Sequence, residues 1–300
     1  MIEGTRAAPS TSGVKIRPRF LERRSVRLVL GKLVLYPILL GGATVLTIPL
    51  AWLLSSSLKL SGLIFVIPPQ WIPSPIAWEN YLEVWRTVPM LLFLRNTVTI
   101  TFFAVLGTLV SASVVAFGFA RLRFMYRDAL FLVLLGTVMI PSQVILIPQY
   151  ILFRSLGWLD TFLPLTVPHF FGGGAFNIFL MRQFYMTLSL ELDDAARMDG
   201  ASTFLIYRHI ILPQSKPVLG VIAIFSFMGN WNAFFGPLIY LNSSEKYTLA
   251  LGLNLLKGFE YTAWNLLMAM SVMTALPCVL LYFVAQRYFI QGIVFTGVKG

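Results

Sequence analysis

Long apolar runs separated by short charged segments dominate the pattern along this chain. A transmembrane helix needs about 20 apolar residues. Six windows free of Asp, Glu, Lys and Arg reach that length: residues 33–58, 96–120, 129–153, 161–181, 217–244 and 261–286. A seventh uncharged run, residues 60–78, contains four prolines that would break a helix repeatedly, so we expect a loop there. The pattern predicts an all-α membrane protein with six transmembrane helices.

Composition and charge support this interpretation and orient the chain. Hydrophobic residues make up 57% of the sequence and charged residues 12%, whereas a soluble domain carries about 25% charged residues. Of the 23 Lys and Arg residues, 17 lie on one side of the predicted membrane and six on the other. Because positive loops stay in the cytoplasm, both termini are predicted to be cytoplasmic. Residues 1–30 then form a basic arm that holds topology and meets anionic lipid, with nucleic-acid binding as the less favoured alternative.

Several predicted spans contain residues that interrupt a helix or add polarity. Pro141 and Pro148 lie in the third span, Pro168, His169 and three consecutive glycines in the fourth. Polar groups inside a span usually face a cavity or a partner helix. The candidates for a substrate path are Gln143, Asn230, Trp231 and Asn232. Trp231 would offer an aromatic face to a ligand, whereas hydrogen bonding between helices is the alternative for the amides. Asn230 and Asn232 are two residues apart, so they point to nearly opposite faces of a helix.

The segment 186–217 is polar and lies between two apolar runs. Four of the twelve acidic residues of the chain fall between Glu191 and Asp199. Ser189 is suited to cap a first short helix and Gly200 to end it in a left-handed conformation. Ser202 or Thr203 would cap a second helix, and Pro213 would stop it. The segment is thus predicted as helix, turn, helix, either as a docking element or as an ordinary amphipathic interfacial helix.

Motifs for self-contained chemistry are absent from the sequence. It has no phosphate-binding Gly-x-x-x-x-Gly-Lys-Ser/Thr loop, no His-Glu-x-x-His and no Cys/His cluster. Its one cysteine, Cys278, lies in an apolar run. None of the six windows contains a carboxylate, a group on which proton- or sodium-coupled carriers usually rely. We therefore expect a chain that is not an enzyme, holds no metal or cofactor itself, and receives energy from a partner.

The polar segment resembles a known signature. Asp194-Ala195-Ala196, Gly200 four positions later and the Ile210…Leu212-Pro213 ending resemble the cytoplasmic loop of permease subunits in binding-protein-dependent ABC importers. That pattern begins with Glu, and Asp194 keeps the charge with a shorter reach. Further similarity to the carbohydrate branch, and within it to the maltose-type G subunit, comes from Asn80-Tyr81, Trp231-Asn232, Pro237 and the terminal stretch 292–300.

This resemblance implies a type I ABC importer permease fold over residues 31–290, a coupling loop at 186–217 and a cytoplasmic tail at 291–300. The implied ATPase-coupling residues are Asp194, Ala195, Ala196, Asp199, Gly200, Ile210, Leu212 and Pro213. The implied partners are a second homologous permease, two copies of a cytoplasmic ATPase that binds ATP and Mg²⁺, and an extracytoplasmic solute-binding protein. A sugar is the expected substrate, carried across a bacterial or archaeal cell membrane. A polyamine, peptide or glycerol phosphate permease and a secondary carrier are the alternatives.

Overall fold

The computed structural model describes residues 19–258 and 262–297, with side chains over 32–258 and 262–286. Within these residues the regular structure is helical, apart from one isolated bridge between Lys257 and Thr262. The chain divides into two units, residues 1–52 and 53–300. The first unit holds most of helix α1 (Arg19–Ser57), whose side chains are exposed from Lys32 to Ala51. The part of α1 over residues 33–51 is exposed and carries no charged side chain, which is what a lipid-facing span requires.

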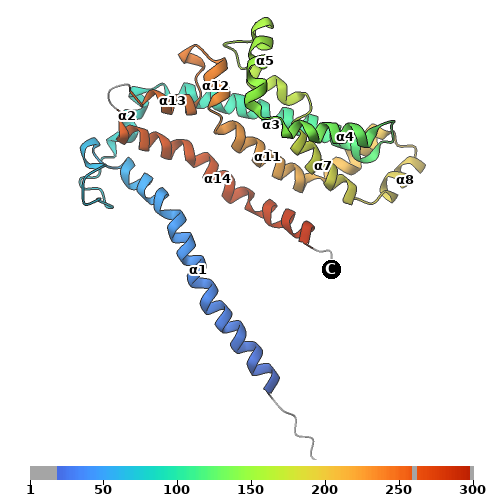
Figure 1. Ribbon diagram of the computed structural model, residues 1–300, viewed down its shortest axis with the longest axis horizontal. Helices are drawn as coiled ribbons and strands as arrows, with labels where there is room; N and C mark the ends of the chain where they lie inside the picture. The colour runs from blue at the N-terminus through green and yellow to red at the C-terminus, as the bar shows by residue number, and fades with distance from the viewer. Residues whose placement is uncertain (1–18, 259–261, 298–300) are drawn as a thin grey trace, which may run out of the picture. The chain divides into compact units, whose positions relative to one another are not determined.

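Helix α3 (Met90–Arg121) is the centre of the second unit. Helices α7 (Ala175–Thr187) and α11 (Lys216–Trp231) pack along it, and α14 (Trp264–Gly297) packs on α11 and on α2 (Glu79–Thr87) (Figure 1). Small side chains allow this close approach. Those buried on α3 include Ala104, Gly107, Ser111, Ala112 and Ala116. The small residues of the second predicted span therefore form its packing face.

Candidate membrane spans in the described residues number three, or up to five. Lys32–Ser57, Met90–Arg121 and Trp264–Gln286 are each long and apolar enough. A further pair, Arg127–Met139 and Ser142–Ser155, is bent by 97°, and Thr203–Gln214 with Lys216–Trp231 is bent by 76°. The first pair comprises α4 (Arg127–Gly136), a 3₁₀ turn (Thr137–Met139) and α5 (Ser142–Ser155), with Pro141 at the break. The count of six spans and the cytoplasmic termini stay predictions.

The second and fourth predicted spans differ from the expected windows. α3 begins at Met90, ahead of Asn96, and the Asn96 amide is buried and donates to the backbone oxygens of Glu245 and Tyr247. The fourth window, 161–181, is not one helix. It contains α6 (Leu163–Thr166), a 3₁₀ turn (Val167–Phe170) and the start of α7. Pro168 and a run of three glycines with positive φ, residues 172–174, break it.

The last two windows are also reshaped. α11 ends at Trp231 and is followed by α12 (Phe235–Tyr240), a 3₁₀ turn (Ser244–Lys246) and α13 (Leu249–Leu255). α14 continues past Arg287 to Gly297, so residues 291–297 of the expected tail are helical. Residues 1–18 of the expected arm and 298–300 of the tail lie outside the described residues. The proline-rich run 60–78 has only a 3₁₀ turn (Ser61–Leu63), which confirms the loop expected there.

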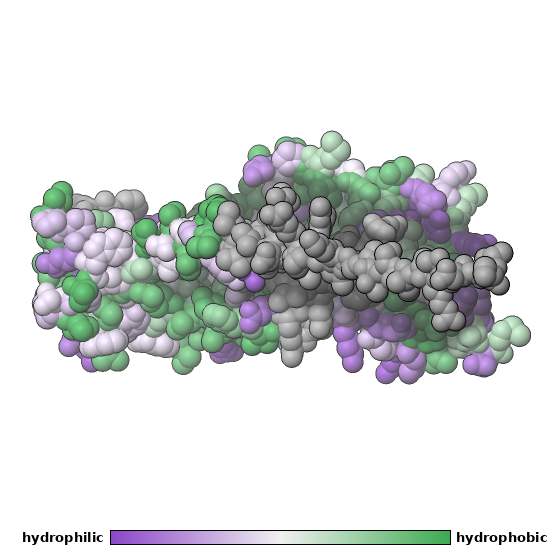
Figure 2. All heavy atoms as spheres, turned by 90° about the horizontal axis from the view of Figure 1, so that it is seen from below, coloured by the Kyte–Doolittle hydropathy of each residue, from purple (hydrophilic) through white to green (hydrophobic). Residues whose placement is uncertain are grey.

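Hydrophobic residues cover much of the surface seen in Figure 2, whereas hydrophilic residues gather toward the end of the second unit that carries α8 and the turn between α3 and α4. An uneven distribution of this kind is typical of a chain whose middle lies in lipid and whose polar segments lie in water.

Candidate functional site

Helix α8 (Glu191–Met198) has defined ends. The Ser189 hydroxyl accepts from the Glu191 backbone N–H at 3.2 Å. At the other end, the Gly200 N–H donates to the Arg197 oxygen (3.0 Å) and the Ala201 N–H to the Ala196 oxygen (2.9 Å), with Gly200 at φ 81°. This is a Schellman ending, which needs a residue in the left-handed conformation and therefore favours glycine. The predicted role of Gly200 is confirmed, whereas the N-cap position is Leu190 and Ser189 lies one residue before it.

The second helix of the segment begins as predicted and ends later. α9 (Thr203–Ile206) is capped by the Ser202 hydroxyl, which accepts from the Leu205 N–H at 3.3 Å. The helical path then passes through a π turn (Tyr207–Ile211) and α10 (Leu212–Gln214) before it bends at Ser215. Pro213 does not stop the helix, because it sits in the first turn of α10, where a missing N–H is tolerated.

A buried ion pair attaches α8 to the helical core. Arg121, at the end of α3, donates from Nη2 to the backbone oxygens of Tyr185 and Leu188, both at 2.9 Å. Its Nη1 lies 3.6 Å from Oδ2 of Asp193, and the two side chains are 1% and 3% exposed. One guanidinium therefore joins the ends of α3 and α7 to α8. The sequence predicted for Asp193 only a preference for the helix start, and it missed Arg121 as a partner.

Most of the predicted coupling residues lie on the exposed side of this segment. Asp194, Ala195, Asp199, Gly200 and Pro213 are exposed, Ile210 and Leu212 are half-buried, and Ala196 is buried in the core. The Asp194 carboxylate is 3.3 Å from Arg197, a surface pair that contributes little to stability. Met198 and Phe204 are 88% and 64% exposed beside them. We call Asp194, Ala195, Met198, Asp199 and Phe204 the α8 surface; it combines carboxylates with apolar side chains.

A cleft of about 500 Å³ opens in the second unit beside the middle third of α3. It lies between Thr108 of α3, the turn at Pro168–His169, the start of α7 and the α11 residues Phe225 to Asn230. Gly173 has a φ of +64°, and a Cβ there would stand 2.7 Å from the Thr108 oxygen. Only glycine lets the broken fourth window approach α3 this closely. We call this space the His169 cleft.

Polar side chains of the His169 cleft form a chain across three elements. The Thr108 hydroxyl lies 3.1 Å from His169 Nδ1 and accepts from the Ser226 hydroxyl at 3.4 Å. The Asn230 amide donates to the Ser226 backbone oxygen at 2.8 Å. On the opposite rim, the Asn177 amide donates to the Gly173 oxygen at 2.7 Å. The lining thus includes hydroxyl, amide and imidazole groups, and the Thr108 hydroxyl links α3 to the turn at His169 and to α11.

The four predicted path residues do not meet in one place. Asn230 lines the His169 cleft, whereas Trp231 and Asn232 both line a separate cleft of about 320 Å³ that also includes Lys257. Trp231 is 6% exposed, donates from Nε1 to the Thr274 oxygen at 3.0 Å and stacks on Phe227, so it ties α11 to α14. Gln143 is exposed on α5 and lines neither cleft. The two asparagines face different spaces, as their spacing predicted.

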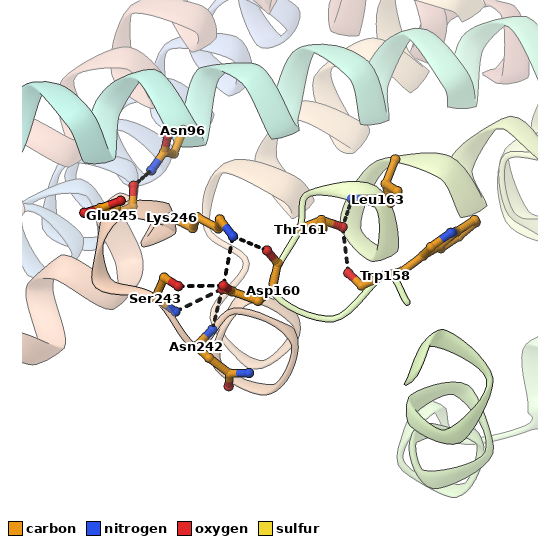
Figure 3. A network of polar contacts seen from close by, with 9 residues as sticks. All are labelled: Asn96, Trp158, Asp160, Thr161, Leu163, Asn242, Ser243, Glu245 and Lys246. Carbon is orange, nitrogen blue, oxygen red and sulfur yellow. Dashed lines mark hydrogen bonds and ion pairs between the residues drawn. The ribbon is translucent and has the colours of Figure 1, made fainter. Parts of the chain in front are cut away.

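A second polar cluster joins the loop after α5 to the loop after α12 (Figure 3). Oδ1 of Asp160 accepts from the backbone N–H groups of Asn242 (3.0 Å) and Ser243 (2.9 Å). Oδ2 accepts from the Ser243 hydroxyl (2.5 Å) and from Lys246 Nζ (2.8 Å). The Lys246 ammonium, helped by Ser243, holds the pKa of Asp160 well below its usual range. The cluster fixes two loops that are distant in sequence.

A comparison of the sequence with protein families identifies the chain. Residues 112–294 match the family described as binding-protein-dependent transport system inner membrane component. The chain belongs to this family. It is accordingly a multi-pass permease subunit of an ABC importer in the cell membrane.

Relatives of this permease carry names that refer to different solutes. It is 33% identical to the arabinooligosaccharides transport system permease protein AraQ of Halalkalibacterium halodurans, over 76% of this chain and 81% of that protein. It is 31% identical to the sn-glycerol-3-phosphate transport system permease protein UgpE of Rhizobium meliloti, over 92% of this chain and 99% of that protein.

A solved structure shares the fold of the permease. A chain of a bacterial ABC transporter that imports the acidic polysaccharide alginate superposes with a TM-score of 0.76 at 24% identity, covering 91% of this chain and all of the other. The broken helices described above therefore belong to the type I importer permease fold that the sequence resemblance predicted.

Proposed function

We propose that this permease carries a sugar or oligosaccharide into the cell and is driven by a separate ATPase that docks on the α8 surface. The sugar assignment is supported by the arabinooligosaccharide relative and by the described lining of the His169 cleft, which combines aromatic rings with uncharged hydroxyl and amide groups. The glycerol phosphate relative supports the second candidate, a permease for a small phosphorylated solute.

The attachment of α8 carries the coupling proposal. A helix that transmits a rigid-body displacement must be anchored on one side and open on the other. Asp193 and Ala196 anchor α8 in the core, while Asp194 and Ala195 are exposed. The small Ala195 lets a partner approach the backbone, and the carboxylates of Asp194 and Asp199 suit a basic groove. Displacement of α8 then reaches α3 through Arg121.

The assembly we propose follows from the family. A second homologous permease completes the path, two copies of the ATPase bind ATP and Mg²⁺ on the cytoplasmic side, and a solute-binding protein delivers the sugar outside. In this arrangement the permease performs no hydrolysis itself. A secondary carrier is the weaker alternative, because none of the apolar windows contains a carboxylate.

The docking proposal is tested by enlarging Ala195. Ala195→Trp places a large ring on the α8 surface without altering a cap, and Ala195→Ser changes the same position by one hydroxyl. We expect the Trp variant to reach the membrane in normal amounts but to lose at least about tenfold in copurified ATPase and in ATP-driven uptake, as for a blocked interface core. The Ser variant should behave as the wild type.

Two results would contradict docking at α8. Normal copurification of the ATPase with Ala195→Trp would show that the α8 surface is not part of the interface with the ATPase. Equal losses in the Trp and Ser variants would show that position 195 supports the fold rather than the contact.

A further inference from the structure

We propose that the His169 cleft receives a ring of an uncharged sugar as it crosses the membrane, so that this permease passes neutral oligosaccharides and rejects anionic ones. This inference rests on the proposed function and specifies its substrate class. It favours a neutral sugar, such as the one in the name of the arabinooligosaccharide relative, over the anionic glycerol phosphate and acidic polysaccharide named for other similar proteins.

The depth of the cleft makes it a candidate for the path itself. Thr108 lies in the middle third of the central span α3, well away from Arg121 at one end and Met90 at the other. Polar side chains at such a depth are costly in lipid and face a cavity or another protein surface. The volume of about 500 Å³ falls within the range of roughly 300–1,000 Å³ typical of small-molecule sites.

Charge is the feature that selects the substrate. The cleft is lined by hydroxyl, amide, imidazole, glycine and aromatic groups, and among the residues that the structure describes no Asp, Glu, Lys or Arg contributes to its lining. An ionised phosphate or carboxylate moved from water into such a site would lose its hydration without gaining a cationic partner, which is strongly unfavourable. A neutral sugar exchanges its water hydrogen bonds for those of the amides and incurs no such penalty.

Hydrogen-bonding capacity remains available on both rims. Thr108 and Ser226 bond to each other and to His169, and the Asn177 and Asn230 amide nitrogens bond to backbone oxygens. Among the described residues no hydrogen bond reaches His169 Nε2 or the side-chain oxygens of Asn177 and Asn230. Sugar hydroxyls both donate and accept, so they can bond to imidazole and amide groups of this kind.

Two phenylalanines supply the apolar part of a sugar site. Phe176 of α7 and Phe225 of α11 line the cleft and are 54% and 47% exposed, with ring centroids 6.5 Å apart at an interplanar angle of 70°. A sugar ring has a C–H face that packs on an aromatic face while its hydroxyls point sideways to polar groups. Aromatic walls with a few placed polar groups are the usual composition of a small-molecule site.

The test measures substrate selection by the whole importer. The permease is purified with its own ATPase, second permease and binding protein and placed in proteoliposomes with ATP. Uptake is measured for labelled arabinotriose and maltotriose as neutral probes, and for sn-glycerol 3-phosphate and a mannuronate trimer as anionic probes. The variants are Asn230→Asp, Asn230→Ala and Phe225→Ala, and Asn232→Asp is the matched control two residues away, outside the cleft.

We expect the wild type to take up at least one neutral probe and neither anionic one. Asn230→Ala and Phe225→Ala should each lower neutral uptake about tenfold, the size expected for losing one well-placed contact. Asn230→Asp should lower it further, whereas Asn232→Asp should stay within about twofold of the wild type, and ATP hydrolysis stimulated by the binding protein should continue in every variant.

Three results would overturn this inference. One is ATP-driven uptake of an anionic probe by the wild type. Another is an Asn230→Ala variant that transports like Asn232→Asp. A third is loss of the second permease on purification of the cleft variants, which would make the cleft an interface between subunits. Failure of the wild type to move any probe with ATP would instead count against the proposed function.

Discussion

Gly200 ends α8 at a φ of 81°, and no atom lies within 4 Å of the position that a Cβ would take. A substitution there is limited by the backbone conformation and not by space. For an L-residue the left-handed conformation costs about 1–2 kcal/mol, and Asn tolerates it better than Ala. We predict that Gly200→Ala loosens the α8 turn and lowers ATPase copurification several-fold, while Gly200→Asn retains most of it.

Limited proteolysis of the 186–217 segment provides the measurement for Gly200. Faster cleavage is expected for Gly200→Ala than for Gly200→Asn, with the exposed Thr203→Ala as a control outside the Schellman turn. Equal cleavage rates for the Ala and Asn variants would show that the left-handed conformation of Gly200 does not hold the turn.

Single residues also show what a sequence can and cannot reveal. Ser189, Gly200 and Ser202 act on neighbours within three positions, so their roles follow from local patterns. Asp193 acts on Arg121 in another helix, and nothing in the local pattern names that partner. The sequence gives only the spacing of three that puts Asp193 and Ala196 on one side of a helix; the structure shows that this side is buried, where a carboxylate requires a countercharge.

Between elements, the Arg121–Asp193 pair is the connection most open to a quantitative test. Both side chains are almost fully buried, while Arg121 Nε and Asp193 Oδ1 have no hydrogen-bond partner in the described residues. Removing one member of a buried pair costs about 3–5 kcal/mol because a charge is left unpaired, whereas replacing both by apolar residues is often near neutral. We predict that Arg121→Met and Asp193→Leu each lower the melting temperature of the complex, and that the double variant recovers part of it, because the backbone oxygens of Tyr185 and Leu188 still lose their donor.

Transport separates a stabilising pair from a transmitting one. If Arg121 and Asp193 pass displacement from α8 to α3, the double variant should hydrolyse ATP yet take up less sugar per ATP than the wild type. Additive losses of stability would show that the pair is not coupled. If the double variant takes up as much sugar per ATP as the wild type, the Arg121–Asp193 pair stabilises the fold but does not transmit displacement.

The sequence predicts where the helices within the apolar windows break, but not the angle between the two parts of each broken helix. Pro141 and the glycines at 172–174 signal interruptions, and the structure has breaks at both. The bend of 97° at Pro141 and the turn that brings His169 beside Thr108 depend on packing against α3. Hydropathy cannot show this, because it registers the length of an apolar run and not whether the run is straight. The start of α3 at Met90 was missed since charged Arg95 had excluded its first turn from the window.

For the molecule as a whole, the coupling proposal depends on the orientation of the chain in the membrane. Coupling requires α8 on the cytoplasmic side, and the excess of Lys and Arg predicts this. A test replaces the single native cysteine, Cys278, with Ala and adds one exposed cysteine at a time. We choose Met125, in the turn between α3 and α4, and Glu83, on α2.

A membrane-impermeant maleimide should label Glu83→Cys in intact spheroplasts and Met125→Cys only in inverted vesicles, because the two positions lie on opposite sides of the predicted membrane. The Cys278→Ala parent without an added cysteine gives the background in both preparations. Labelling of Met125→Cys from outside would show that the chain has the opposite orientation to the predicted one. The α8 segment would then lie outside the cell, where a cytoplasmic ATPase cannot bind it, and the coupling proposal would be wrong. Labelling of both positions from one side would instead show that α3, the helix between them, does not cross the membrane.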